Sequence, residues 1–239
     1  MIADVNTLDS ADIDVEVRDL VEERGITRLC HFTQSRNLAH IFGDQSGLQA
    51  TNTLKKFRMP FNASDENRYD RHEDLICCSI EYPNVFYFTT ARGREILFKD
   101  WAVLLIRPDY IWLESSRFCP CNAATGGGAY VCSGVEGFDS LYDVSPPGPN
   151  TVRRGSRHMH EVPTNIQAEV MVQGQISSSD ITGIVFQSEK QALMELTRLK
   201  ILKVELECPM YVCPEFYDKV AMTNAIKNSA KPEMKLFKS

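Results

Sequence analysis

The chain has 239 residues, of which 43% are hydrophobic and 24% are charged. This length and composition support a buried core and one large domain, and they exclude disorder as the default state. No apolar run approaches the roughly 18 to 20 residues that a membrane span needs, and the N-terminus is acidic where a signal peptide is basic. We therefore expect a cytoplasmic protein that does not contact membranes.

The formal net charge of −6 is unevenly distributed. Residues 1–24 hold eight acidic side chains against Arg18 and Arg24, so this segment carries the whole excess. The remaining chain is balanced, with basic clusters at residues 55–58 and 153–160 and in a lysine-rich tail. A local anion-binding face is therefore compatible with the negative total.

Eight cysteines are too sparse over this length for a disulfide scaffold, and most are expected to be buried as small hydrophobic residues. A zinc site built from Cys119, Cys121 and Cys132 with His158 or His160 is the alternative. The Cys-x-Cys spacing lacks the usual gap of two to four residues, so we expect no metal.

Apolar periodicity and capping residues predict the elements of the first half. Ser10 is a candidate N-cap for an amphipathic helix that ends at Gly25, and Ser35 is a candidate cap for a helix that ends near Gly43. Residues 44–74 are polar and predict a long loop. The remaining predicted elements here are strands at 26–33, 75–80 and 101–106, a turn at 82–84 and a helix at 89–99.

The second half begins with an irregular region at 120–164, followed by predicted strands at 166–172, 181–186 and 201–206. A helix is predicted to begin at Ser188, with Gln191 completing a capping box. Strands without a regular βαβ alternation indicate the α+β class. We expect an acidic N-terminal helical extension at 1–25, a main domain at 26–206 and a C-terminal extension at 207–239.

The segment 166–172 carries the most informative polar pair. In a strand, alternation places Ile166, Ala168 and Val170 on one face and Gln167 and Glu169 on the other. A carboxylate beside an amide on an open strand face, directly after a long loop, is a candidate site. Alternation alone is equally compatible with ordinary solvent-facing polar residues.

The Gln-x-Glu pair at a strand start resembles the catalytic signature of ADP-ribosyltransferases. Residues 163–172 more specifically resemble the DarT family, toxins that ADP-ribosylate single-stranded DNA. Further matches follow in order along residues 26–186: Cys30-His31-Phe32-Thr33 with Asn37-Leu38, Arg68-Tyr69-Asp70 leading into 79–84, and Phe118 with Asn122-Ala123-Ala124. The resemblance implies an ADP-ribosyltransferase fold for 26–206, a split β-sandwich with flanking helices and an NAD cleft.

Cleavage of the nicotinamide ribosyl bond passes through an oxocarbenium-like state that a fixed carboxylate stabilises. The resemblance implies Glu169 and Arg68 as catalytic residues and NAD as the co-substrate. The implied NAD-binding residues are His31, Thr33, Asn37, Gly47, Leu48, Arg68, Arg71 and Ser79. The implied acceptor-binding residues are Gln167, Arg153, Arg154, Arg157, His158 and Asn122. Structural histidines and solvated arginines are the alternative interpretation.

Phe138 and Tyr142 are candidates for stacking an unpaired base. The Ser-Ile-x-x-Pro-Asn and Asn-Ala-Ala motifs favour guanine over thymine as the acceptor. The resemblance also implies an antitoxin with ADP-ribosyl hydrolase activity, such as a macrodomain. Two alternatives stay open: an ADP-ribosyltransferase that modifies protein or RNA, and a catalytically silent binding module with the same fold.

Overall fold

The computed structural model describes residues 12–44, 47–59 and 70–238. The helices are α1 (Val15–Arg24), α2 (Thr51–Lys56), α3 (Val85–Arg94), α4 (Gly134–Ser140), α5 (Glu189–Ile201) and α6 (Lys219–Lys227). The strands are β1 (Leu29–Gln34), β2 (Gly47–Gln49), β3 (Leu75–Ile80), β4 (Trp101–Ile106), β5 (Arg117–Cys119), β6 (Glu169–Gln173), β7 (Gln175–Ser177), β8 (Ile181–Phe186), β9 (Met210–Val212) and β10 (Lys235–Leu236).

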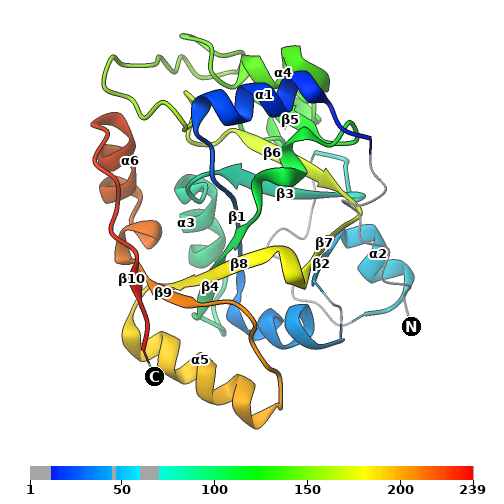
Figure 1. The fold of residues 1–239 in the computed structure, drawn as a ribbon, viewed down its shortest axis with the longest axis vertical. Coiled ribbons are helices and arrows are strands. Elements are labelled where there is room, and N and C mark those ends of the chain that lie inside the picture. The colour runs from blue at the N-terminus through cyan, green and yellow to red at the C-terminus, as the bar shows by residue number, and fades with distance from the viewer. Residues whose placement is uncertain (1–11, 45–46, 60–69, 239) are drawn as a thin grey trace.

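Eight strands form one sheet in the order β10-β9-β8-β4-β1-β3-β6-β5, and β2 and β7 form a separate pair (Figure 1). Strand β1 pairs with β4 along its whole length, from Leu29↔Ile106 to Gln34↔Trp101. With β3 it pairs only at Leu29↔Ile80 and Cys30↔Ser79. The large sheet therefore splits beyond Cys30 into a β10-β9-β8-β4-β1 half and a β3-β6-β5 half.

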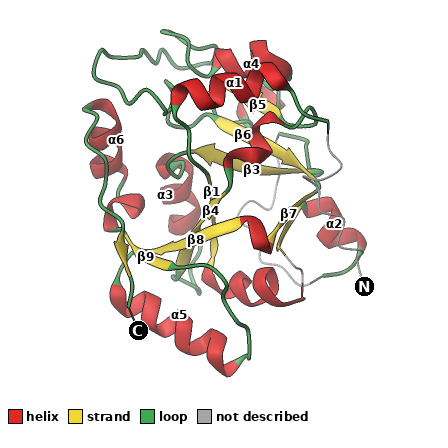
Figure 2. Cartoon of the chain, in the orientation of Figure 1, coloured by secondary structure: helices red, strands yellow, loops and turns green. Residues whose placement is uncertain are grey.

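Helices cover both halves (Figure 2). Helices α3 and α6 bury Phe88 and Met222 against Val103 of β4 and its neighbours. Helix α1 packs beside α4 and buries Val17 and Val21 in the cluster that contains the β3-β6-β5 half. Each such side chain contributes about 1.5–3 kcal/mol when fully buried, so the helices fix the two halves in place. This arrangement confirms the predicted α+β class and the split sandwich.

The predictions that rest on unambiguous local signals are confirmed. Strand β4 covers the predicted 101–106 and all six side chains are buried, as a continuous apolar run requires. Strands β3 and β8 have the predicted bounds. Helix α5 begins after Ser188, whose Oγ accepts a hydrogen bond from the Gln191 backbone amide at 3.3 Å.

Other predicted bounds are wrong. Helix α1 begins after Asp14, which caps it through the Val17 amide, whereas the predicted cap Ser10 lies outside the described residues. The predicted 82–84 turn ends in the N-cap of α3, because Asn84 accepts from the Tyr87 amide, so this helix starts and ends earlier than expected. From Ser35 to Asp44 the chain forms a short 3₁₀ turn followed by π-helix.

Four predictions of irregular regions or strands also differ from the structure. The predicted 44–74 loop contains β2 and α2, and the predicted 120–164 irregular region contains α4. The predicted 201–206 strand does not form, because α5 continues to Ile201 and the next strand is β9. Strand β6 begins at Glu169, three residues after the expected start.

The segments after residue 206 join the main sheet. Strand β9 pairs in parallel with β8, β10 pairs with β9, and α6 packs on α3. The domain boundaries at 25/26 and 206/207 stay predictions. Within the described residues, no helix is long and apolar enough to cross a membrane.

Candidate active site

Glu169 is the first residue of β6 and pairs with Cys119 of β5. Its exposed fraction is 7%, and Met171, two residues on along the same strand face, is fully buried. The prediction of an open polar face is therefore wrong. Residues 119–123 cover this face and pack Cys119, Cys121 and Ala123 around Met171. A buried carboxylate of this kind is costly unless hydrogen bonds compensate for lost water.

Asn122 supplies one such hydrogen bond. Its Nδ2 donates to Glu169 Oε1 at 2.9 Å, and its Oδ1 accepts from the Ala124 backbone amide at 3.1 Å. A backbone amide only donates, so the Ala124 contact fixes which side of the Asn122 amide faces the carboxylate. Asn122 thereby orients Glu169. Its predicted contact with the acceptor stays a prediction.

Gln167 is half-buried in a turn directly before β6. Asn165 holds this turn: its Oδ1 accepts from the Gln167 amide at 3.0 Å and its carbonyl accepts from the Ala168 amide at 2.9 Å. The expected side-by-side placement of Gln167 and Glu169 on one strand is therefore wrong, because the strand begins only at Glu169. Gln167 still lies two residues from the carboxylate.

Three predicted NAD-binding residues lie together on β1 and the turn after it. His31 Nδ1 lies 2.8 Å from the Cys77 carbonyl, across the split just beyond the last β1–β3 pair. Since a carbonyl only accepts, Nδ1 carries the proton. Thr33 is buried and its hydroxyl accepts from Asn37 Nδ2 at 2.9 Å.

Gly47 and Leu48 lie on β2, opposite β7. Gly47 has φ +136, and a Cβ there would lie 2.0 Å from the Ile176 carbonyl oxygen. Close approach of the β7 backbone therefore requires glycine at this position. Leu48 is buried opposite Ile176. The predicted cofactor contacts of both residues stay predictions.

The remaining predicted NAD-binding residues differ in placement. Arg68 lies outside the described residues, and Arg71 is exposed. Ser79 is buried on β3, where its hydroxyl donates to the Cys30 carbonyl at 3.4 Å. The last β3–β6 pair is Cys78↔Val170, so Ser79 and Glu169 are each the next residue beyond this ladder.

Two cysteines near Glu169, Cys78 and Cys119, have a raised pKa, whereas the hydrogen bond with Cys119 lowers the pKa of Cys121. Burial raises the pKa of Cys78, and the charge of Glu169 adds to the shift. A hydrogen bond with Cys121, followed by burial, raises the pKa of Cys119, and the two sulfur atoms lie 3.9 Å apart. Among the described residues, no group of three or more His, Cys, Asp or Glu side chains is arranged to hold a metal ion.

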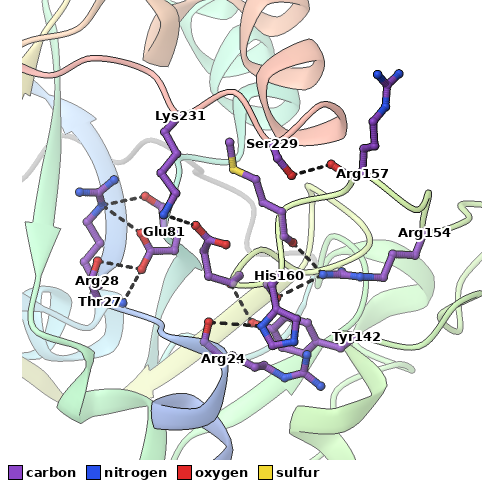
Figure 3. Close-up of polar contacts among 12 residues, drawn as sticks. Arg24, Thr27, Arg28, Glu81, Tyr142, Arg154, Arg157, His160, Ser229 and Lys231 are labelled. Carbon is purple, nitrogen blue, oxygen red and sulfur yellow. Dashed lines mark hydrogen bonds and ion pairs between the residues drawn. The ribbon is translucent and has the colours of Figure 1, made fainter.

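The basic cluster lies in residues 143–168, which we call the pre-β6 loop. Arg153 and Arg157 are exposed, and Figure 3 shows the Arg157 side chain extending away from the polar network. Arg154 is half-buried, and its guanidinium donates to the carbonyls of Met159 at 2.7 Å and Val162 at 2.9 Å. Two of the predicted DNA-binding arginines thus face solvent, whereas Arg154 organises its own loop.

His158 is half-buried, with Nε2 3.0 Å from the Pro163 carbonyl. Burial and the nearby charge of Arg154 lower its pKa. The prediction that Phe138 and Tyr142 stack a base is wrong. Phe138 is fully buried against Phe118, and Tyr142 is 7% exposed.

Comparison with known proteins identifies the fold. Thermus sp. 2.9 DarT in complex with ADP-ribosylated ssDNA aligns with a TM-score of 0.55 and 12% identity, covering 81% of this chain and 97% of that one. The complex of the same protein with NAD+ aligns with a TM-score of 0.53 and 12% identity, covering 80% and 98%. Thermosipho africanus DarTG in complex with ADP-ribose aligns with a TM-score of 0.54 and 12% identity, covering 80% of this chain and 51% of that chain. A search of curated proteins finds no significant match.

These likenesses show that the chain has the fold of DarT, whose Thermus sp. 2.9 member is seen in complex with NAD+. The family model described as ssDNA thymidine ADP-ribosyltransferase, DarT, matches residues 30–218, well over half of the chain. The chain therefore belongs to the DarT family, and it is an NAD-dependent ADP-ribosyltransferase of single-stranded DNA.

The sequence alone did not identify the contact between Asn122 and Glu169. The Asn-Ala-Ala motif was visible, but a hydrogen bond across 47 positions in the sequence has no local signal. The sequence also did not predict the ion pair between Glu81 and Arg28. Glu81 is buried directly after β3, and its Oε2 lies 3.7 Å from Arg28 Nε. A carboxylate in a mostly apolar segment is the signal that the sequence offers.

Proposed function

We propose that Glu169 is the catalytic carboxylate of this transferase. The observation that carries the proposal is its buried position at the start of β6, where Asn122 holds one carboxylate oxygen in a fixed direction. Positive charge develops on the ribose as the nicotinamide bond breaks. A carboxylate oriented before the reaction stabilises that charge without reorganising.

In the proposed reaction, the bond between the ribose C1′ and the nicotinamide nitrogen breaks and the bonding electrons leave with nicotinamide. A nucleophilic atom of the DNA base then bonds to C1′ and loses a proton. Glu169 is placed to stabilise the ribosyl cation and to accept that proton. Every atom of the ADP-ribose is transferred to the base.

We assign the NAD side of the site to the split between β1 and β3. His31 and Thr33 supply polar atoms on β1, Asn37 follows them, and Ser79 lies on β3. The proposal keeps Arg68 as a second catalytic residue. It also keeps Arg68 and Arg71 as phosphate ligands, because a guanidinium binds phosphate bidentately. Gly47 and Leu48 complete the proposed cofactor set.

We place the acceptor strand over the pre-β6 loop. Arg153 and Arg157 are exposed cations there, as phosphate contacts require, and Gln167 lies in the turn two residues before Glu169. The family description names thymidine, so we propose thymine as the acceptor base. The sequence-based preference for guanine has no support in the described contacts, and it becomes an outcome of the test.

We further infer that the protein is the toxin of a toxin–antitoxin pair and acts in the cytoplasm, where NAD and DNA are available. The Thermosipho africanus relative is a DarTG protein, and this chain corresponds to about half of that chain. The partner proposed for this chain is an antitoxin with ADP-ribosyl hydrolase activity, such as a macrodomain.

The test incubates the protein with adenylate-labelled NAD and with separate single-stranded oligonucleotides of thymine-rich or guanine-rich composition. Wild-type protein is expected to label the thymine-rich oligonucleotide. Glu169→Gln is expected to lose at least about 10²-fold in rate. Glu205→Gln is the matched control, because it removes an exposed carboxylate on the segment after α5.

Each other outcome identifies an alternative. Label on the guanine-rich oligonucleotide alone refutes thymine. In parallel incubations with separate pools of RNA and protein, label there and none on DNA refutes a DNA acceptor. Absence of any NAD cleavage indicates a silent binding module. Equal rates for Glu169→Gln and wild type would exclude Glu169 as the catalytic carboxylate.

A further inference from the structure

The pre-β6 loop is held together from within by Arg154. Besides the Met159 and Val162 carbonyls, its guanidinium reaches the His160 carbonyl at 3.2 Å and the Thr164 hydroxyl at 3.3 Å. Thr164 in turn donates to the Asp143 carbonyl at 2.8 Å, near the start of the loop. The loop is therefore a folded unit that ends directly at Glu169.

The N-terminal helix contacts this unit through its last residue. The Arg24 guanidinium lies 3.7 Å from the ring centre of Tyr142, and the Arg154 guanidinium lies 5.7 Å from the same ring (Figure 3). The Tyr142 hydroxyl donates to the Glu161 carbonyl at 3.1 Å. Arg24 thus makes a cation–π contact with the Tyr142 ring, and such a contact is stronger when it is buried. Tyr142 in turn supports the middle of the loop through its hydrogen bond to Glu161.

The C-terminal segment contacts the loop at three points. The Met159 amide donates to the Ile226 carbonyl at 3.1 Å, and the Ser229 hydroxyl donates to the Arg157 carbonyl at 2.7 Å. Lys231 Nζ lies 2.7 Å from Glu161 Oε1 (Figure 3). Helix α6 and the residues after it therefore hold the side of the loop opposite α1.

The Lys231–Glu161 pair joins an exposed lysine to a largely buried carboxylate. The Glu161 side chain is 12% exposed and the Lys231 side chain is 72% exposed. Burial acts to raise the pKa of Glu161, but the contact with Lys231, a backbone hydrogen bond and the positive charges of Lys231 and His160 together hold the pKa below its usual value. Removing the lysine would leave a poorly solvated carboxylate inside the loop.

Both contacting segments lie outside the part of the chain that matches the family. The match covers residues 30–218, whereas Arg24 precedes it and Ile226, Ser229 and Lys231 follow it. The contacts from both terminal segments therefore involve residues beyond the matched range.

We propose that Arg24 and Lys231 are positioning residues for the acceptor step, because the two terminal segments hold the pre-β6 loop in the conformation that receives single-stranded DNA. This inference rests on the proposed function, in which the loop borders the acceptor. A loop that is already ordered spares the DNA the cost of ordering it on binding. Loss of the terminal contacts then raises the KM for DNA and leaves cleavage of NAD by water unchanged.

The test compares Lys231→Met, Glu161→Gln and the double variant with wild-type protein. For each, the KM and kcat of transfer to a thymine-rich oligonucleotide are measured, together with the rate of NAD hydrolysis without DNA. Lys231→Met is expected to raise the KM for DNA by about 10-fold, with hydrolysis within about 2-fold of wild type. The double variant is expected to be no worse than Lys231→Met, because the two residues act as one pair.

Two controls separate this role from simpler ones. Lys235→Met removes an exposed lysine of β10 and is expected to match wild type, whereas Lys231→Arg keeps the charge and is expected to restore the KM. Arg24→Gln is expected to reproduce the effect of Lys231→Met from the other side of the loop. A melting temperature for every variant confirms that each one is folded.

Specific results overturn the inference. If Lys231 binds DNA phosphate directly, the effects of Lys231→Met and Glu161→Gln on the KM add. The slope of log KM against log salt concentration then also falls by about one, the value for one lost phosphate contact. A parallel fall in transfer and hydrolysis assigns the pair to general stability. If the KM for DNA of Lys231→Met equals that of wild type, the terminal contacts do not position the loop, and the proposed function is unaffected. Failure of wild-type protein to label DNA refutes both.

Discussion

The hydrogen bond between Asn122 and Glu169 gives the sharpest test of the site. Asn122→Ala removes the donor 2.9 Å from Glu169 Oε1 and leaves the buried carboxylate free to rotate. A hydrogen bond to a charged group contributes roughly 1.5–3 kcal/mol. If that contribution is expressed in the transition state, kcat/KM for NAD falls by roughly 10- to 150-fold.

Asn122→Asp extends the test through pH. It places a second carboxylate beside Glu169, and two like charges at this separation share a proton, which raises the pKa of the pair. The rate of Asn122→Asp is therefore expected to rise with pH over a range in which the wild-type rate is flat. The measurement is the pH profile of kcat/KM with labelled NAD.

Asn224→Asp is the matched control, since it makes the same chemical change on the exposed side of α6. It is expected to follow the wild-type profile. If Asn122→Ala retains wild-type kcat/KM within about 2-fold, the carboxylate does not depend on this hydrogen bond. The reasoning that fixes its direction through Asn122 is then refuted.

Three further perturbations concern the surroundings of the site. Gly47→Ala would place a Cβ 2.0 Å from the Ile176 carbonyl, so the free energy of unfolding in urea is expected to fall by about 2–4 kcal/mol; an unchanged midpoint contradicts this. Glu81→Gln leaves Arg28 without its buried partner and is expected to cost about 3 kcal/mol in the same assay, whereas a loss below about 0.5 kcal/mol would assign no stabilising role to the pair. Burial and then neighbouring positive charge lower the pKa of His158, so its stabilising contribution is complete above pH 6.5 and declines as the pH falls through its folded pKa. His158→Gln is accordingly expected to flatten the dependence of the melting temperature on pH below about 6.5, and an unaltered slope counts against it.

The sequence predicted the elements whose signals are local. The run at 101–106 is apolar throughout, so only a fully buried strand accommodates it, and Ser188 followed by Gln191 is a capping pattern that leaves little choice of helix start. Asn84 was ambiguous, because an asparagine after proline suits both a turn and an N-cap. The structure uses it as the cap of α3.

The predictions that failed depend on distant parts of the chain. Alternation alone cannot tell that residues 119–123 cover the strand face of Glu169 and Met171, so that face was expected to be open. Equally, the sequence shows that Arg154 has hydrogen-bond donors but not which acceptors they meet. Its carbonyl partners, Met159 and Val162, lie five and eight residues further along an irregular loop whose path the sequence does not reveal.

The position of Glu169 relative to the split explains why a buried carboxylate suits this chemistry. At the closed end, where β1 still pairs with β3, Glu81 adopts φ 63 and its carbonyl accepts from Arg28 Nε at 2.9 Å. Ser79 pairs with Cys30 of β1 at this level, and Ser79 and Glu169 are the next residues beyond the last β3–β6 pair, Cys78↔Val170. Glu169 therefore lies near the closed end, whereas His31 follows the last β1–β3 pair. We propose that NAD enters on the His31 side, so that the bond to be broken meets a carboxylate that Asn122 has already oriented.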